Sequence, residues 1–393
     1  MSGRAFLHTP GPTNIPDRVL EALRRSATDF LSEDFIGLAD RCQIGLQAVF
    51  GTVSPVVIYT ASGHGAWEAA FANLTAPGDH ILLPATGLFS MAWEEMATDL
   101  GLVVESIPSD ERRAIDADRV VDHLRADTAH QIKMVALVHT ETATGVTSDV
   151  QSIRRAIAEL GHPAMVAVDA IASLGTAPLL MDRWDLDVVI GASQTGLMCP
   201  PGLSFTAIGP RALVQARTQP RASSYWSWAR RLEGEFYRRF GGTPPVHLLF
   251  ALHEALAMIA DEGLDRVLSR HARLAGSVRA AVDAWAADGN GMEFNALIPA
   301  ERAEALTCVR TPPGVDAEEL RVVARDHFNV ILGGGLGEKL AGRAFRIGHL
   351  GDLNEPMVLG ALGGVELALA HCGVPHGPGG VSAAIDYLQA DSA

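Results

Sequence analysis

The most constraining feature of this sequence is a regular alternation of short apolar runs and amphipathic stretches between Pro55 and about Gly209. The runs VVIYT, HILLP, LVVESI and KMVALVH are rich in Val, Ile and Leu, which is typical of strands buried on both faces. Between them, apolar residues recur at helical spacing, with helices expected from Gly65, after Gly87 and over 117–126. This alternation predicts an α/β domain with a doubly wound, mainly parallel sheet.

Two further apolar runs, AMVAVD and LDVVIGAS, follow one another and end in polar or small residues. Parallel strands deliver such side chains to the carboxyl edge of the sheet, where α/β proteins bind ligands. Asp169 ends the first run. An aspartate at this place either caps the next helix or contacts a ligand, so Asp169 is a candidate site residue.

Composition limits the classes of function. The chain has 393 residues, 48% of them hydrophobic, enough for a large domain and a smaller one. A formal net charge of −15, without any block of Lys and Arg, disfavours nucleic acid as a partner. The start lacks the apolar core of a signal peptide, and no apolar run approaches the roughly 18 residues of a membrane span. We therefore expect a cytoplasmic protein without a membrane partner.

The four cysteines are scattered without paired spacing, which argues against a metal site and against a disulfide framework: Cys42, Cys199, Cys308 and Cys372. A glycine run, GGGLG at 333–337, lacks the spacing of a dinucleotide-binding fingerprint. We interpret this run as a flexible loop of the C-terminal part.

The phrase GASQTGLMCPPGLSF, residues 191–205, closely resembles the active-site segment of class V, fold-type I aminotransferases, which depend on pyridoxal phosphate (PLP). The similarity is strongest to the alanine/serine/aspartate–glyoxylate group and extends from Gly11 to about Gly373. It implies a fold-type I PLP-transferase fold with three parts: an N-terminal arm and helices over 1–50, a large cofactor-binding domain over 51–262 and a small C-terminal α+β domain over 263–393.

In that family the residue after Ser-Gln is the lysine that holds the cofactor as a Schiff base, and here this place is taken by Thr195. A threonine supplies neither the covalent bond nor the proton shuttle of a lysine at neutral pH. The only lysines of the chain are Lys133 and Lys339. Lys133 is expected at the wrong end of its strand, and Lys339 in a loop of the small domain.

The resemblance assigns the cofactor's phosphate and ring to several positions. Ser62, Gly63 and His64 open a helix after the strand VVIYT, where free N–H groups and the helix dipole favour an anion. Asp169 would keep the ring nitrogen protonated and make the ring an electron sink. Phe89 would stack on the ring, although its alternative role is plain core packing.

Three more positions carry the resemblance on the cofactor side. Thr144, in the motif HTETATG, would approach the ring, whereas the first residue of that motif, His139, is expected to be structural. Ser193 and Gln194 match the hydrogen-bonding residues before the lysine.

Outside the sheet, Thr243 in GGTPP resembles the residue that reaches the phosphate of the neighbouring subunit, which implies a homodimer with shared sites. Arg346 in FRIGHLG resembles the arginine that binds the substrate carboxylate, a task that suits its planar fork. Two places depart from the family pattern: Phe30-Leu31 replaces a polar pair, and Phe240 replaces a tyrosine.

The resemblance implies amino transfer between a small amino acid and a 2-oxo acid such as glyoxylate, with PLP or pyridoxamine phosphate (PMP) bound non-covalently. Three interpretations of Thr195 remain open. In the first, Thr195 is an engineered change that traps a complex. In the second, it is a natural change in a paralogue that holds PLP, PMP or a preformed aldimine for a narrower reaction. Alternatively, the chain is a non-catalytic binding or partner subunit.

Overall fold

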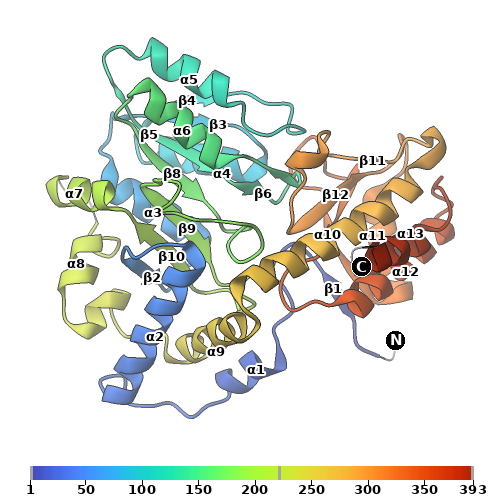
Figure 1. The fold of residues 1–393 in the computed structure, drawn as a ribbon, viewed down its shortest axis with the longest axis horizontal. Coiled ribbons are helices and arrows are strands. Elements are labelled where there is room, and N and C mark those ends of the chain that lie inside the picture. Colours follow the sequence, from blue (N-terminus) through green and yellow to red (C-terminus); the bar gives the residue numbers. More distant parts are fainter. Residues whose placement is uncertain (1–2, 220–222, 391–393) are drawn as a thin grey trace.

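The computed structural model describes residues 3–219 and 223–390. Its larger sheet has the strand order β2-β10-β9-β8-β5-β3-β4 within these residues (Figure 1). Its strands are β2 (Val56–Tyr59), β3 (His80–Pro84), β4 (Val103–Ile107), β5 (Ile132–Val138), β8 (Met165–Asp169), β9 (Val188–Ala192) and β10 (Ser204–Ile208). The neighbouring strands β4, β3, β5, β8 and β9 are parallel to one another. Strand β10 is antiparallel to both β9 and β2. The predicted doubly wound, mainly parallel sheet is confirmed.

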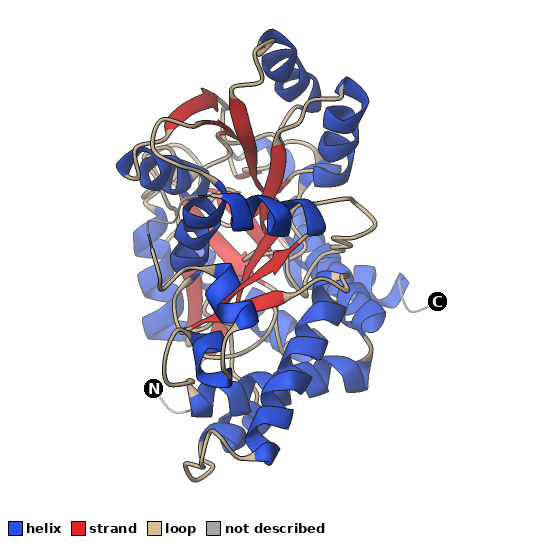
Figure 2. Ribbon diagram, turned by 90° about the vertical axis from the view of Figure 1, so that its left-hand side faces the viewer, coloured by secondary structure: helices blue, strands red, loops and turns tan. Residues whose placement is uncertain are grey.

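Helices cover both faces of this sheet, and Figure 2 shows the strands between them. They are α1 (Asp17–Leu23), α2 (Glu33–Phe50), α3 (Gly63–Leu74), α4 (Leu88–Asp99), α5 (Ala117–Ala126), α6 (Val150–Leu160), α7 (Pro210–Thr218), α8 (Trp228–Glu233), η1 (Phe236–Phe240) and α9 (Val246–Glu262). Alternation along β8 shows why both faces are filled. Val166 and Val168 enter the core shared with α5 and α6, whereas Ala167 packs on the side of α3 and α4.

A second sheet has the order β1-β13-β14-β12-β11 within the described residues. Its strands are β1 (Phe6–His8), β11 (Glu293–Phe294), β12 (Leu306–Arg310), β13 (Val330–Gly334) and β14 (Ala344–Gly348), and a separate hairpin joins β6 (Thr140–Glu141) to β7 (Val146–Thr147). The remaining helices are α10 (Leu264–Trp285), η2 (Ala287–Gly289), η3 (Pro299–Glu301), α11 (Ala317–Phe328), α12 (Glu355–His371) and α13 (Gly380–Ala390).

The N-terminal segment and α10 connect the two parts. Strand β1 pairs in parallel with β13, so Phe6–His8 belongs to the second sheet. Helix α10 contributes Val267 to the core of the larger part and Leu274 to the core of the smaller part. The domain boundaries expected at residues 50 and 262 stay a prediction.

The glycine run was expected to be a loop, and this expectation is wrong for its first two residues. Gly333 and Gly334 lie in β13 and pair with Arg346 and Phe345 of β14. A Cβ on Gly333 would lie 2.7 Å from the Cδ of Pro10. The missing side chain thus lets the N-terminal segment cross the strand. No helix within residues 3–219 and 223–390 is long and apolar enough to cross a membrane.

A glycine next to the predicted site tests the packing of this sheet edge. A Cβ on Gly196 would lie 2.3 Å from the carbonyl oxygen of Leu174, which is backbone and cannot turn aside. We expect Gly196→Ala to lower the free energy of unfolding in urea by about 2 kcal/mol, as overpacking does. Gly363 in α12 has open space around it, so Gly363→Ala should be neutral or stabilising by up to about 1 kcal/mol. Equal effects of the two changes would contradict this packing.

Candidate active site

A cavity of about 150 Å³ lies at the carboxyl ends of β5 and β8, between the two sheets. It brings together residues from the N-terminal segment, the larger sheet and the second sheet. Its lining comprises Pro10, Gly11, Ser62, Gly63, His64, Trp67, Phe89, Val138, Thr140, Thr142, Asp169, Ile171, Ala172, Gln194, Thr195, Leu336 and Arg346. Eight predicted site residues thus share one cavity: Ser62, Gly63, His64, Phe89, Asp169, Gln194, Thr195 and Arg346.

Asp169 is held at the end of β8 by two hydrogen bonds. One carboxylate oxygen accepts the backbone N–H of Ile171 at 2.7 Å, and the other accepts the indole N–H of Trp67 at 3.0 Å. Burial raises the pKa of Asp169 to about 7, and the nearby carboxylate of Glu141 contributes in the same direction. A cationic group in the cavity would therefore favour the ionised form of this side chain.

The N-terminus of α3 forms another wall. Ser62 precedes the helix, and its side chain makes no capping hydrogen bond. Within the described residues, no acceptor is bonded to the N–H groups of Gly63 and His64. A Cβ on Gly63 would lie 2.2 Å from the Cδ1 of Ile171, so glycine is needed for this close approach. Free N–H groups at the start of a twelve-residue helix suit an anion such as a phosphate.

Aromatic rings line the wall beside this helix terminus. The centroid of the His64 ring lies 4.3 Å from that of Trp67 and 6.5 Å from that of Phe89. Trp67 is fully buried, and its ring also stacks on that of Trp93, with the ring centroids 5.6 Å apart. Phe89 is half-buried and faces the cavity. The sequence did not single out Trp67, because its contact with Asp169 joins residues distant in the chain.

Arg346 supplies the cationic group of the cavity. Its Nε donates to the carbonyl oxygen of Gly334 at 2.7 Å, and its Nη1 donates to that of Thr142 at 2.8 Å. Among residues 3–219 and 223–390, no carboxylate lies within ion-pair distance of this guanidinium. Burial lowers the pKa of Arg346 from its usual value. A buried guanidinium without a protein counter-charge suits a carboxylate ligand.

Thr195 also lines this cavity. Its hydroxyl donates to the carbonyl oxygen of Ile171 at 2.5 Å. Thr13 fixes the backbone here, since its N–H and hydroxyl bond to the carbonyl oxygens of Gln194 and Thr195 at 3.1 Å each. The methyl group of Thr195 faces Gly11, where an added Cβ would be 3.0 Å away.

Four residues with assigned or considered roles do not line this cavity. The hydroxyl of Ser193 donates to the carbonyl oxygen of Pro200 at 2.7 Å, which turns it away. Thr144 and His139 are buried, and neither the hydroxyl of Thr144 nor the Nδ1 of His139 has a hydrogen-bond partner among the described residues. Thr243 is exposed after η1. Its expected contact with a neighbouring subunit stays a prediction.

Both lysines lie outside the cavity. Lys133 is exposed near the start of β5 and donates to the carbonyl oxygen of His130 at 3.1 Å. Lys339 is half-exposed and pairs with Glu111 at 2.9 Å. Their amines are thus engaged elsewhere on the surface.

Glu141 is a buried carboxylate that sequence reasoning did not assign. It accepts backbone N–H groups of Phe89, Ser90 and Ala143 at 3.1–3.4 Å. Burial raises its pKa to about 7. Its place in the HTETATG motif was the available signal.

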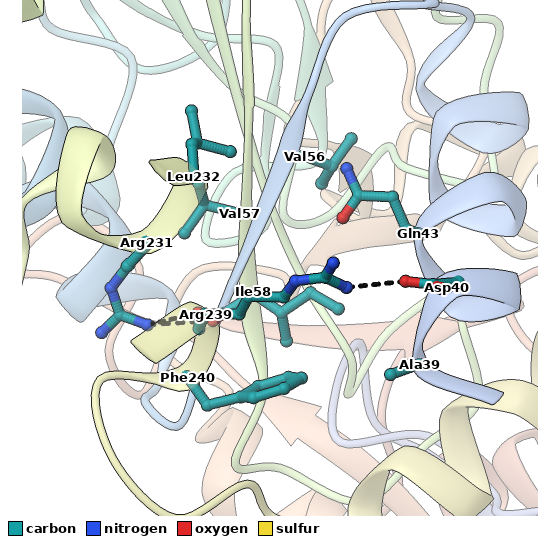
Figure 3. Close-up of a pocket in the computed structure, with 10 residues that line it drawn as sticks. All are labelled: Ala39, Asp40, Gln43, Val56, Val57, Ile58, Arg231, Leu232, Arg239 and Phe240. Atoms are coloured by element: carbon teal, nitrogen blue, oxygen red, sulfur yellow. Dashed lines mark hydrogen bonds and ion pairs between the residues drawn. The ribbon is translucent and has the colours of Figure 1, made fainter. Parts of the chain in front are cut away.

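A second cavity lies between α2, β2 and the segment from α8 to η1 (Figure 3). Both of its cations are hydrogen-bonded within the protein, although the buried Nη2 of Arg231 has no partner among the described residues. Arg239 pairs with Asp40 at 2.6 Å, and Arg231 donates to the carbonyl oxygens of Tyr225, Ile58 and Arg239 at 3.0–3.3 Å. We therefore interpret this cavity as structural, with Arg231 anchoring the turn before Thr243.

Comparisons with known proteins identify the family of this chain. The family model described as "Aminotransferase class-V" matches residues 5–336. Serine–glyoxylate aminotransferase from Methylorubrum extorquens is 41% identical over 98% of this chain and 96% of its own. L-aspartate–glyoxylate aminotransferase from Paracoccus denitrificans is 34% identical over 100% and 98%. The crystal structure of pyridoxamine–pyruvate aminotransferase from Mesorhizobium loti is 28% identical, with a TM-score of 0.89 over 99% of this chain and 98% of that one. This chain belongs to the class V aminotransferase family.

Proposed function

We propose that this protein binds PLP or PMP without a covalent bond and moves an amino group between a small amino acid and a 2-oxo acid such as glyoxylate. The observation that carries the proposal is the shared cavity of Asp169, the α3 N-terminus and Arg346. The glyoxylate substrates named for the two relatives support the substrate class.

The residues of the cavity fit the cofactor. Ser62, Gly63 and His64 would hold its phosphate, because the backbone N–H groups of Gly63 and His64 have no acceptor among the described residues and Ser62 makes no capping bond. Asp169 would face the ring nitrogen, and Phe89 would cover the ring. When bound, the cofactor supplies an electron sink for a carbanion at the amino acid's α-carbon. Arg346 would orient the amino acid by its carboxylate.

We further propose that Thr195 stands where relatives carry the lysine. Its hydroxyl is bonded to the carbonyl oxygen of Ile171, so it is not poised as a base. The titratable side chains that line the cavity in the described part of the chain are His64, Asp169 and Arg346. Any proton transfer there must use these groups or water.

The alternative is a lysine-free paralogue that uses a vitamin B6 compound for a different reaction, or a non-catalytic partner subunit. The name of the Mesorhizobium protein supports the first of these, since it takes pyridoxamine as a reactant. The distant positions of Lys133 and Lys339 are consistent with both.

We also propose a homodimer in which Thr243 reaches the site of the other subunit. Its exposure and the anchoring of the preceding turn by Arg231 support this arrangement. The phenylalanine at 240 is buried in the core and offers no hydrogen bond there.

Calorimetry with PLP and with PMP tests cofactor binding. Wild-type protein should bind reversibly, and borohydride should leave no mass increase on the chain. Thr195→Lys should give PLP fixed to residue 195 by borohydride, detected by peptide mass, because the aldehyde would already lie beside this position. Thr195→Val keeps the shape without an amine and should give none. Amination of glyoxylate with serine as donor tests the reaction, and the lysine variant should gain roughly 10²- to 10⁴-fold in rate.

The absence of PLP and PMP binding in wild-type protein, together with no fixation in Thr195→Lys, would reject this function. The cofactor site would then be a relic, and the non-catalytic alternative would hold.

Arg346→Ala should weaken binding of glyoxylate or serine to the PLP- or PMP-loaded protein by roughly 10- to 100-fold, as loss of a charged hydrogen-bonded pair does. Affinity for the cofactor should change little. Arg343, which is exposed nearby, provides the control variant Arg343→Ala. Calorimetry that shows equal losses for cofactor and carboxylate would mean that Arg346 is structural.

Stability should depend on pH through Asp169. Its pKa is about 7 in the folded protein and 3.8 as a reference, so its protonation stabilises the fold at low pH. This contribution is complete below about pH 4 and is lost as pH rises to about 7. In urea unfolding from pH 5 to 8, the stability of the wild type minus that of Asp169→Asn should fall by roughly 1–3 kcal/mol, because buried histidines such as His139 and His271, whose pKa is lowered, affect both proteins alike. The exposed Asp99→Asn should match the wild type, and an unchanged slope in Asp169→Asn would contradict the assignment.

A further inference from the structure

Glu141 is a fully buried carboxylate without a cationic partner in the described part of the chain. Thr140 and Thr142 on either side line the cavity, whereas Glu141 does not, as expected where neighbouring side chains alternate. Its side chain points to the start of α4. There it accepts the first N–H groups of the helix, and the helix dipole stabilises its negative charge. The carboxylate therefore lies directly behind the cavity wall.

Glu141 contacts the aromatic wall through the backbone. Its Oε2 accepts the N–H groups of Phe89 and Ser90 at 3.2 Å each. The contact leaves no space between them, since a Cβ on Gly87 would lie 2.7 Å from the Cγ of Glu141. The hydroxyl of Ser90 also accepts the N–H groups of Thr86 and Gly87 at 2.8 and 3.0 Å. The position of Phe89 is thus set relative to this carboxylate.

The guanidinium wall at Arg346 contacts the turn that begins at Glu141. The Oε1 of Glu141 accepts the N–H of Ala143 at 3.1 Å, which closes the turn around Thr142. The carbonyl oxygen of Thr142 accepts a hydrogen bond from the Nη1 of Arg346 at 2.8 Å. One carboxylate therefore connects α4 of the larger part with a guanidinium carried by the second sheet.

We propose that Glu141 is a positioning residue, whose carboxylate fixes the aromatic wall at Phe89 relative to the guanidinium wall at Arg346. Under the proposed function, which this role deepens, it sets the distance between the cofactor-stacking ring and the group that binds the substrate carboxylate. Glu141 itself touches neither ligand.

The test uses the ligand-free full-length chain and two local readouts. Glu141→Gln keeps the shape but offers one acceptor oxygen in place of two, so the hydrogen bonds to residues 89 and 90 and the bond to Ala143 cannot all be kept. Hydrogen exchange of the peptide covering these residues should accelerate by about tenfold or more, and modification of Arg346 by phenylglyoxal should accelerate similarly. Exchange in β4 should stay unchanged and show that the fold is intact.

Glu111→Gln is the matched control. Glu111 is also buried and lies close enough to influence Glu141, but its carboxylate pairs with Lys339 instead of the cavity wall. It should change neither readout. If Glu141→Gln does not fold, Glu141→Asp, which keeps the charge on a shorter side chain, should show the same changes at smaller size.

Faster exchange at residues 89 and 90 with unchanged reactivity of Arg346 would overturn the proposal, because Glu141 would then be only a local helix cap. Calorimetry with PMP separates this proposal from the proposed function. A wild-type chain that shows the coupling but binds neither PLP nor PMP would refute the function and still support the positioning role.

Discussion

The register of the parallel strands β5, β8 and β9 is the constraint on which the site depends. Val138 pairs with Asp169, and Asp169 pairs with Ile190, so the three strands end at nearly the same level. The segments that follow therefore meet at one edge. A slip of one residue in β8 would turn Asp169 to the face of the valine core and away from Trp67. Burial of Val166 and Val168 on that face keeps the register.

The electrostatics of the cavity follow from how its charges are satisfied. The carboxylates of Asp169 and Glu141 are bonded to N–H donors, and within the described residues neither is paired with a cation. The guanidinium of Arg346 is likewise bonded to carbonyl oxygens. Neutral dipoles hold each charge in place, so Asp169 and Arg346, which line the cavity, remain available to ligand groups of opposite charge. A direct pair between Arg346 and Glu141 would have neutralised both.

Local patterns predicted much of the fold and part of the site. The β8 strand, the start of α3 and the strand that carries Arg346 are each visible in a few neighbouring residues. Sequence spacing could not give side-chain direction inside a tight turn, so it did not show that Ser193 and Thr144, expected on the cofactor side, lie outside the lining of the cavity. The pairing of β1 with β13 and the contact of Trp67 with Asp169 join distant segments, which no local periodicity encodes.

Arg346 is a buried cation that lines the cavity of a chain of net charge −15. A dissolved carboxylate is repelled by the net negative charge once it comes within about a Debye length, roughly 8–10 Å, of the surface, and the attraction of Arg346 takes over only at the cavity. Long-range electrostatics thus slow the encounter, whereas the final contact is attractive and shielded from solvent ions. Added salt should therefore raise the association rate constant for an anionic ligand while leaving its dissociation rate constant nearly unchanged.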